Sequence, residues 1–366
     1  MEGNDLMILA YVKRRSEEPS LIRLVLTSVI MYVLVVFTGI IVLMLSTGFE
    51  IRDLTRVLLD YTNLASPEVI RYTVIIALLS LALLINVAGG YINLGGEGIV
   101  ALSMLGFLIA SIYDLGILGG FIVSILLVIA WASIPYLAKI YLDSSDVLLS
   151  FLQNFIALFI INHIVAHVFR GELARPRSPP IDPSINLHYV SQSNILYGFL
   201  GRVSIESIIG VVIATITLSY LLTRTRAGFS LRLLSYSTKT ASISGVNIPR
   251  YILLNLLISS VVLSLASAEL LLGGTRVIYY NENAKIGIGS MSFGLGYVSL
   301  SIAILSVRNP YIVLLYSYIL ALGYIIVSLS ASLVIRVAIV GLALLSVLLT
   351  ELLLRYEVRL GWYSKH

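Results

Sequence analysis

The amino-acid sequence predicts an all-α polytopic membrane protein with about ten transmembrane helices, some of them broken, and with both termini in the cytoplasm. The composition is the first reason, because 58% of the 366 residues are hydrophobic and only 12% are charged. An ordinary soluble domain is about 25% charged. The mean hydropathy of +0.99 and a series of long uncharged stretches are the other two reasons. A soluble enzyme, a nucleic-acid-binding protein and a disordered protein are therefore excluded for the whole chain.

Ten uncharged stretches are candidate spans, since a transmembrane helix needs about 20 mainly apolar residues. Most of them reach this length, and the shorter stretches 98–113 and 337–350 can borrow flanking residues. The polar segments between them are too short to form a soluble domain with its own core. The ten stretches are 24–49, 72–96, 98–113, 115–138, 147–169, 207–223, 251–268, 286–307, 309–335 and 337–350.

The distribution of Lys and Arg predicts the orientation. With the N-terminus inside and the spans alternating, the inner side holds 14 of these residues and the outer side holds 9. Residues 1–22 are polar, and the full-length span that follows lacks a small-residue cleavage site, so we expect an uncleaved first helix. The expected organisation is a cytoplasmic segment at 1–23, a transmembrane domain at 24–354 and a cytoplasmic tail at 355–366.

Two loops stand out from the others. The outer loop at 170–202 contains four prolines, which fix φ and remove backbone donors, so it is predicted to be irregular. The inner loop at 223–250 carries five basic residues and no acidic residue. Its interior at 230–244 lacks Gly and Pro, and its leucines fit a short amphipathic helix at the membrane surface. This loop is either a topology signal alone or a docking segment for a cytoplasmic partner.

The segment NVAGGYINLGGEG at 86–98 places two glycine pairs, two asparagines and Glu97 inside an apolar region. Glycine pairs weaken a helix, and non-helical backbone at membrane depth persists only where it is buried in protein or lines a cavity. A helix broken in this way is typical of a transport pathway. The alternative is an ordinary inner loop in which Glu97 is solvated.

The sequence offers no catalytic set and no metal site. There is no cysteine, no phosphate-binding G-x-x-x-x-G-K-[ST] loop and no H-E-x-x-H motif. His163 and His167 share a helix face but lack a third ligand, which favours two histidines at the membrane edge. Glu269, near the outer end of a span, is either an interface anchor or a functional group. The two halves of the chain show no convincing self-similarity.

Two segments in the first half of the chain carry recognisable motifs. Residues 93–98, NLGGEG, match the pattern N-[IL]-G-x-E-G. Residues 145–154, SDVLLSFLQN, match N-E-V-[IL]-x-T-x-x-x-N, with Asp146 in place of Glu and Ser150 in place of Thr. The final asparagine, Asn154, matches outright.

Two further segments follow in the second half. Residues 228–246 match G-x-x-[IL]-R-A-x-G-x-N-x-x-A-A-x-x-x-G-[IV], with Ser235 and Ser237 replacing Gly and Asn. Residues 296–310 match G-F-x-G-I-A-V-A-L-L-G-x-x-x-P, with two serines replacing glycines. In this order, the four segments resemble the permease subunits of binding-protein-dependent ABC importers, in the branch that serves simple sugars and nucleosides. Related branched-chain amino-acid permeases usually lack the Glu that stands here at Glu97.

The resemblance implies a plasma-membrane permease that is not itself an enzyme and binds no cofactor. ATP and Mg would bind a separate ABC ATPase. A second permease, expected to be a non-identical chain, and an extracellular substrate-binding protein would complete the importer in the lipid bilayer, with no nucleic acid. The alternatives are a branched-chain amino-acid ABC permease and an ion-coupled secondary transporter, for which the acidic residues are few and peripheral.

The resemblance also implies two groups of site residues. The loop at 223–250 would couple the permease to the ATPase, with Arg232 as its anchor. The candidate coupling residues are Leu231, Arg232, Leu234, Lys239, Ala241 and Gly245. The candidates for the helix break and translocation pathway are Asn93, Gly95, Gly96, Glu97, Gln153 and Asn154.

Overall fold

The computed structural model describes most of the helical part of the chain. The predicted spans at 24–49 and 337–350 and the far part of the span at 309–335 lie outside the described residues, apart from single positions. The described residues are 6–14, 66–171, 176–190, 197–306, 308–328 and 356–364, with a few single positions in 22–33 and 342–350.

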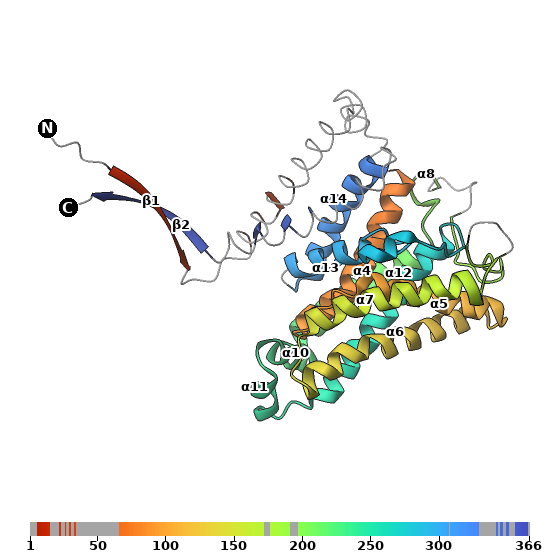
Figure 1. Ribbon diagram of the computed structural model, residues 1–366, viewed down its shortest axis with the longest axis horizontal. Helices are drawn as coiled ribbons and strands as arrows, with labels where there is room; N and C mark the ends of the chain where they lie inside the picture. The colour runs from red at the N-terminus through yellow and green to blue at the C-terminus, as the bar shows by residue number, and fades with distance from the viewer. Residues whose placement is uncertain are drawn as a thin grey trace, which may run out of the picture.

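Eight apolar helices coincide with the other eight predicted spans (Figure 1). Five of these are long and apolar enough to cross a membrane, and α5, α13 and α14 are shorter apolar helices. The eight are α4 (Pro67–Ala88), α5 (Gly96–Ile112), α6 (Gly116–Tyr141), α7 (Asp146–His163), α9 (Ile205–Arg224), α12 (Ile248–Leu272), α13 (Leu295–Leu305) and α14 (Pro310–Ser328). The short elements are η1 (Ile164–Val168), α8 (Tyr197–Leu200), α10 (Arg226–Tyr236), α11 (Thr238–Ile243) and η2 (Glu282–Ile286).

Side-chain caps determine where most of these helices begin. Ser66 precedes Pro67 at the start of α4, and its hydroxyl accepts a hydrogen bond from the Val69 N–H at 3.4 Å. Such a cap satisfies one of the backbone donors that the first turn leaves free. The same role is played at α7, α9, α10, α11 and α12 by Ser145, Ser204, Thr225, Ser237 and Asn247.

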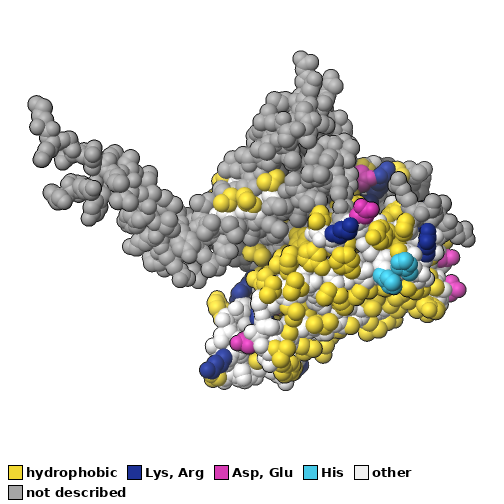
Figure 2. All heavy atoms as spheres, in the orientation of Figure 1, with side chains coloured by type: hydrophobic (Ala, Val, Ile, Leu, Met, Phe, Trp, Pro, Cys, Tyr) yellow, Lys and Arg dark blue, Asp and Glu magenta, His cyan; other side chains and the backbone are white. Residues whose placement is uncertain are grey.

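The helical body has a buried centre and an apolar outer surface. The helix α4 lies at the centre, where it packs against α9, α12, α13 and α14. The peripheral helix α6 instead exposes large apolar side chains, and Leu118 on it is 75% exposed. Figure 2 shows apolar side chains over much of the visible flank of the body, with charged side chains gathered toward its ends. An apolar surface of this extent fits a lipid environment.

The body contains two halves of similar construction. In each half a long helix ends at a glycine pair, and a shorter helix and a further helix follow: α4, α5 and α6 in the first, α12, α13 and α14 in the second. The helix α4 packs against α13 and α14, while α12 packs against α5 and α6, and the two long helices contact each other. The halves begin at the second and seventh predicted spans and therefore run in opposite directions across the bilayer.

A short sequence repeat accompanies these halves. The segment GEGIVALS at 96–103 and the segment GLGYVSLS at 294–301 are identical at five of eight positions. The halves thus share a short similarity at the start of the two short helices, although they show no convincing self-similarity along their whole length. The repeat is hidden elsewhere because one apolar residue replaces another freely in lipid-facing and core positions.

The two ends of the described chain form a pair of strands that the sequence analysis did not predict. Strand β1 (Leu6–Arg14) pairs antiparallel with β2 (Tyr356–Ser364), with Leu6 opposite Ser364 and Arg14 opposite Tyr356. Figure 1 shows them side by side. Paired strands lie on one side of a bilayer, so both segments are on the same side, as the predicted topology requires. Their long sequence separation leaves no hairpin turn signal in the sequence.

Candidate functional site

The helix break predicted at 86–98 is present between α4 and α5. The helix α4 ends at Ala88, and the N–H of Gly89 caps it by donating to Ile85 O at 3.0 Å. Gly90 follows with φ +78°, a left-handed conformation that favours glycine. The chain then runs without regular structure until α5 begins at Gly96, with Tyr91, Asn93 and Gly95 buried and Ile92 exposed.

One face of α7 supplies the hydrogen bonds that this break needs. Asp146 Oδ2 accepts from Ile92 N–H at 3.0 Å, and Ser150 Oγ accepts from Leu94 N–H at 3.0 Å. Asn154 Oδ1 accepts from Gly98 N–H at 2.6 Å. Residues four apart lie one above the other on a helix, and buried backbone donors need partners. The four-residue spacing within the 145–154 motif is thereby explained, since Asp146, Ser150 and Asn154 each accept one N–H from the segment between α4 and α5 or from the start of α5.

Glu97 joins the starts of the two short helices. Its side chain is fully buried and accepts hydrogen bonds from Gly289 N–H at 2.9 Å, from Gly296 N–H at 2.5 Å and from the Ser292 hydroxyl. Glu97 lies in the first turn of α5, while Gly296 lies in the first turn of α13. Each helix N-terminus carries partial positive charge, and the carboxylate stabilises their close approach.

Glycines permit the backbones of α5 and α13 to touch at this junction. A Cβ on Gly96 would lie 3.1 Å from Gly296 O, and a Cβ on Gly296 would lie 2.6 Å from Glu97 N. The alternative in which Glu97 is solvated in an inner loop is therefore wrong. We call the contact of Glu97, Gly96 and Gly296 the half-helix junction.

The remaining predicted pathway residues surround this junction. The Asn154 side-chain NH2 donates to Gly287 O at 2.9 Å and to the Tyr297 hydroxyl at 2.6 Å. Gln153 donates to Trp131 O on α6 at 2.6 Å, and Asn93 Oδ1 accepts from Gly95 N–H at 2.8 Å. All six predicted residues are buried in the body. In this structure their polar groups hold protein backbone and neighbouring side chains.

The basic inner loop forms two short helices rather than the single helix predicted at 230–244. The helix α10 ends at Tyr236, and Ser237 caps the start of α11 by accepting from Thr240 N–H at 3.2 Å. Serine side chains compete with helical backbone hydrogen bonds, which favours a break at this residue. Figure 1 shows both helices together at one end of the body.

The six predicted coupling residues divide between the two sides of these helices. Leu231, Leu234 and Ala241 are buried against the body, with exposed fractions of 1%, 8% and 0%. Arg232 and Lys239 are exposed, and Gly245 is exposed with φ +77° in the turn after α11. One side therefore anchors the helices, and the other presents positive charge.

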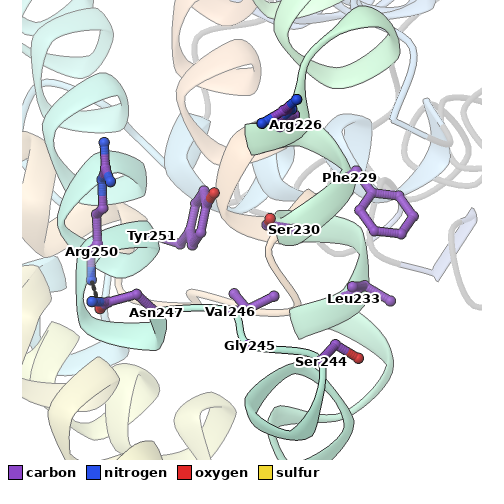
Figure 3. Close-up of a pocket in the computed structure, with 10 residues that line it drawn as sticks. All are labelled: Arg226, Phe229, Ser230, Leu233, Ser244, Gly245, Val246, Asn247, Arg250 and Tyr251. Atoms are coloured by element: carbon purple, nitrogen blue, oxygen red, sulfur yellow. Dashed lines mark hydrogen bonds between the residues drawn. The ribbon is translucent and has the colours of Figure 1, made fainter.

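A pocket of about 690 Å³ lies between α10 and the start of α12 (Figure 3). Arg226 and Arg250 place positive charge at it, and Phe229, which also lines it, is 58% exposed. The sequence analysis named Gly245 but missed these three, although both arginines belong to the acid-free loop. The full lining is Arg226, Phe229, Ser230, Leu233, Ser244, Gly245, Val246, Asn247, Arg250 and Tyr251.

A second buried carboxylate lies at the end of α12. Glu269 Oε2 accepts from Ser204 N–H at 3.2 Å, from Ser204 Oγ at 2.5 Å and from Ser207 Oγ at 2.8 Å, and so holds the start of α9. Its Oε1 lies 3.8 Å from Arg71 Nε. Glu269 is fully buried, so its interpretation as an interface anchor is wrong. Arg71, Ser204 and Ser207 could not be predicted as its partners, because no sequence spacing links them to Glu269.

The two histidines do not form part of a recognisable metal site. The rings of His163 and His167 lie 4.9 Å apart between centroids. Among the residues that the structure describes, no group of three or more His, Cys, Asp and Glu could hold a metal ion.

Comparison with known proteins agrees with this architecture. Residues 67–352 match the family model described as "Branched-chain amino acid transport system / permease component". An uncharacterized protein of Mycoplasma genitalium, MG120, is 25% identical over 280 residues, which are 73% of this chain and 52% of that protein. The chain thus spans about half the length of this relative. The family match covers most of the chain, including every element of the helix break and the basic loop, and the chain is a multi-pass plasma-membrane protein that belongs to this permease family.

Proposed function

We propose that the chain is the permease subunit of an ABC importer and forms part of the translocation pathway for a simple sugar or a nucleoside. The observation that supports this function best is the combination of the family match with the two cytoplasmic helices. The helices α10 and α11 present Arg232 and Lys239 outward while Leu231 and Leu234 fix them to the body. A cationic surface on two helices that pack against the body suits a partner protein that transmits a conformational change to the permease.

The energy for directional transport would come from that partner, a separate ABC ATPase that carries ATP and Mg. A substrate alone can shift the balance between inward and outward states only by its differential affinity for them. The chain has no phosphate loop of its own. ATP-driven closure of the ATPase would move α10 and α11, and these would move the spans.

Two further partners follow from this function. A second permease, which we expect to be a non-identical chain, would complete the pathway, and a substrate-binding protein would deliver the substrate from outside. Residues 176–190 of the outer loop offer a surface for it, where Arg276 donates to Asp182 O at 2.8 Å and to Ile185 O at 2.6 Å. Hydrogen bonds from Ser184 lower the pKa of Asp182 on this surface.

Glu97 supports the sugar or nucleoside branch through the resemblance of its motif. Both oxygens of its carboxylate accept hydrogen bonds at the half-helix junction. Glu97 therefore supports the branch as a sequence motif, and we do not assign it as a ligand of the substrate. The second candidate is a branched-chain amino acid, because the matching family model is described by that transport system while its match leaves the substrate class open.

The test is purification from the native membrane in mild detergent, followed by reconstitution in proteoliposomes. We expect the chain to bring along an ATPase with a Walker A loop and a second polytopic chain. With the binding protein added, uptake of a labelled sugar or nucleoside should depend on ATP. Uptake driven by an ion gradient without any ATPase would contradict the importer function, and ATP-driven uptake of leucine or valine alone would replace the substrate class.

A further inference from the structure

The C-terminal end of α10 touches the turn that leads into the helix break. A Cβ on Gly90 would lie 2.5 Å from Ser235 Cα and 3.2 Å from Leu234 O. A Cβ on the neighbouring Gly89 would lie 3.3 Å from Leu231 Cδ2 on α10 and 2.5 Å from Asn255 Nδ2 on α12. The end of α10 therefore rests directly on the backbone of this turn, with no room for a side chain between them.

The same end of α10 also touches the segment that follows α13. Arg308 Nη2 donates to Ser235 Oγ at 2.7 Å, and the Arg308 guanidinium lies 6.0 Å from the centroid of the Tyr236 ring. This distance is at the limit of a cation–π contact. Arg308 has φ +63°, a backbone conformation that is uncommon for residues other than glycine. This conformation accompanies the contact of its side chain with α10.

These two contacts lie on two arms that meet inside the body. One arm runs from Gly90 through the broken segment into α5, and the other runs from Arg308 back through α13. The arms meet at the half-helix junction, where Glu97 binds both helix starts. A displacement of the end of α10 therefore acts on two joined helices at once.

The turn at Gly90 is stiff enough to carry such a displacement. Lys139 Nζ donates to Gly90 O at 2.6 Å and pairs with Asp146 Oδ2 at 2.8 Å. The same Asp146 oxygen accepts from Ile92 N–H at 3.0 Å. Lys139 and Asp146 thus bind the backbone at Gly90 and at Ile92. A displacement of Gly90 therefore moves the broken segment that follows it.

Resting on the importer function proposed above, we infer that residues 234–236 are the joint that passes movement of the coupling helices to α5 and α13. Gly90 receives it on one arm and Arg308 on the other. The exposed side of α10 and α11 binds the ATPase, whereas Leu234 and Ser235 of the joint face the turn at Gly90. Arg308, Ser235 and Gly90 are positioning residues for transport and have no contact with substrate.

The test uses the complete complex with its ATPase, second permease and binding protein in proteoliposomes. Arg308→Gln removes the charged contact, and Ser235→Ala removes the hydroxyl that accepts from it. Ser133→Ala is the matched control, because Ser133 Oγ donates only to Ala130 O within α6. ATP hydrolysis, subunit assembly and uptake are measured separately for each variant.

We expect Arg308→Gln and the double variant to assemble and to hydrolyse ATP, while uptake per ATP falls about tenfold, as for other couplings between sites. Ser235→Ala alone should show a smaller loss in the same direction, and Ser133→Ala none. Normal uptake per ATP in the double variant would overturn the joint and leave the importer function intact. Loss of ATPase binding would also overturn it, because residues 234–236 would then be a docking surface. Failure of the unaltered complex to show ATP-driven uptake would instead remove the importer function itself.

Discussion

The two glycine-pair turns occupy equivalent places in the two halves of the body, yet they are built differently. The inner turn at Gly89–Gly90 is covered by α10 and tied by Lys139 and Asp146. The outer turn at Gly273–Gly274 follows α12 in an ordinary αR conformation, with φ −75° at Gly273. The inner turn thus needs glycine for its backbone conformation, whereas the outer turn does not.

The surroundings of the outer turn contain buried polar atoms without a hydrogen bond, two of which form the ion pair between Arg71 and Glu269. Arg71 Nε, Glu269 Oε1 and the Tyr189 hydroxyl are buried and form no hydrogen bond within the described chain. Burial raises the pKa of Tyr189, a residue of the outer loop, and the nearby Glu269 adds to the effect. Unpaired buried polar groups cost free energy that opening to water would recover. The inner turn is thus held at its own backbone, whereas the outer turn follows a helix end that Arg71 Nη2 holds through Glu269 O and Leu270 O.

The largest effect is expected at the half-helix junction. Glu97→Gln would replace a carboxylate oxygen that accepts backbone N–H groups by an amide that donates. The loss of charged hydrogen bonds should lower the stability of the complex by about 3 kcal/mol, seen as a lower unfolding temperature in detergent. Ser292→Ala removes one donor to Glu97 and serves as a milder comparison. Unchanged stability of Glu97→Gln would contradict the role of this carboxylate.

The next largest effect is expected at the inner turn. Gly90→Ala adds a Cβ 2.5 Å from Ser235 Cα to a residue with φ +78°. Left-handed backbone alone costs an L-residue about 1–2 kcal/mol, so we expect uptake to fall sharply while the body stays folded. The control is Gly198→Ala, where a Cβ would meet nothing within 4 Å. Equal uptake by the two variants would show that α10 does not act through this turn.

A smaller effect is expected at the outer carboxylate. Glu269→Gln keeps an oxygen that can accept from Ser204 and Ser207, and it loses only the charge that faces Arg71 at 3.8 Å. We expect a destabilisation of about 1 kcal/mol, measured by the same unfolding assay. A loss as large as that of Glu97→Gln would contradict the difference between the two buried carboxylates.

The smallest changes in stability are expected at two serines that occupy equivalent positions in the two halves. Ser264 and Ser80 each lie nine residues before their glycine pair. Ser264 Oγ donates to Ser124 Oγ at 2.8 Å, whereas Ser80 Oγ has no partner within the described chain. Ser264→Ala should cost about 0.6 kcal/mol, a typical value between membrane helices. Ser80→Ala should be neutral or slightly stabilising, and an equal loss at both serines would contradict the unequal packing of the halves.

The sequence predicted those features that depend on local pattern. Uncharged stretches predicted the eight described apolar helices, and the glycine pairs with Glu97 predicted the break between α4 and α5. The spacing of Asp146, Ser150 and Asn154 is visible in the sequence as a helix face. The partners of that face became clear only when the structure placed the broken segment against it.

Features that depend on distant contacts could not be predicted in this way. Glu97 and Gly296 are 199 residues apart, and Arg71 and Glu269 are 198 residues apart. No sequence periodicity links residues at such separations. The sequence alone therefore could not distinguish a buried carboxylate from one at the membrane interface. The pairing of β1 with β2 was missed because the partner strand decides it rather than local propensity alone. The break at Ser237 was missed although a serine there favours it locally.

The most direct test of the account measures whether the coupling helices and the half-helix arms move together. The chain contains no cysteine, so single cysteines can be introduced and spin-labelled without removing any. Ile243, on α11, Tyr311, just beyond Arg308, and Leu142, at the end of α6, are all exposed positions for labels. In the complete complex, addition of a non-hydrolysable ATP analogue should change the distance from Tyr311 to Leu142 and leave the distance from Ile243 to Tyr311 constant. A changed distance from Ile243 to Tyr311 with Tyr311 fixed relative to Leu142 would contradict transmission through the joint.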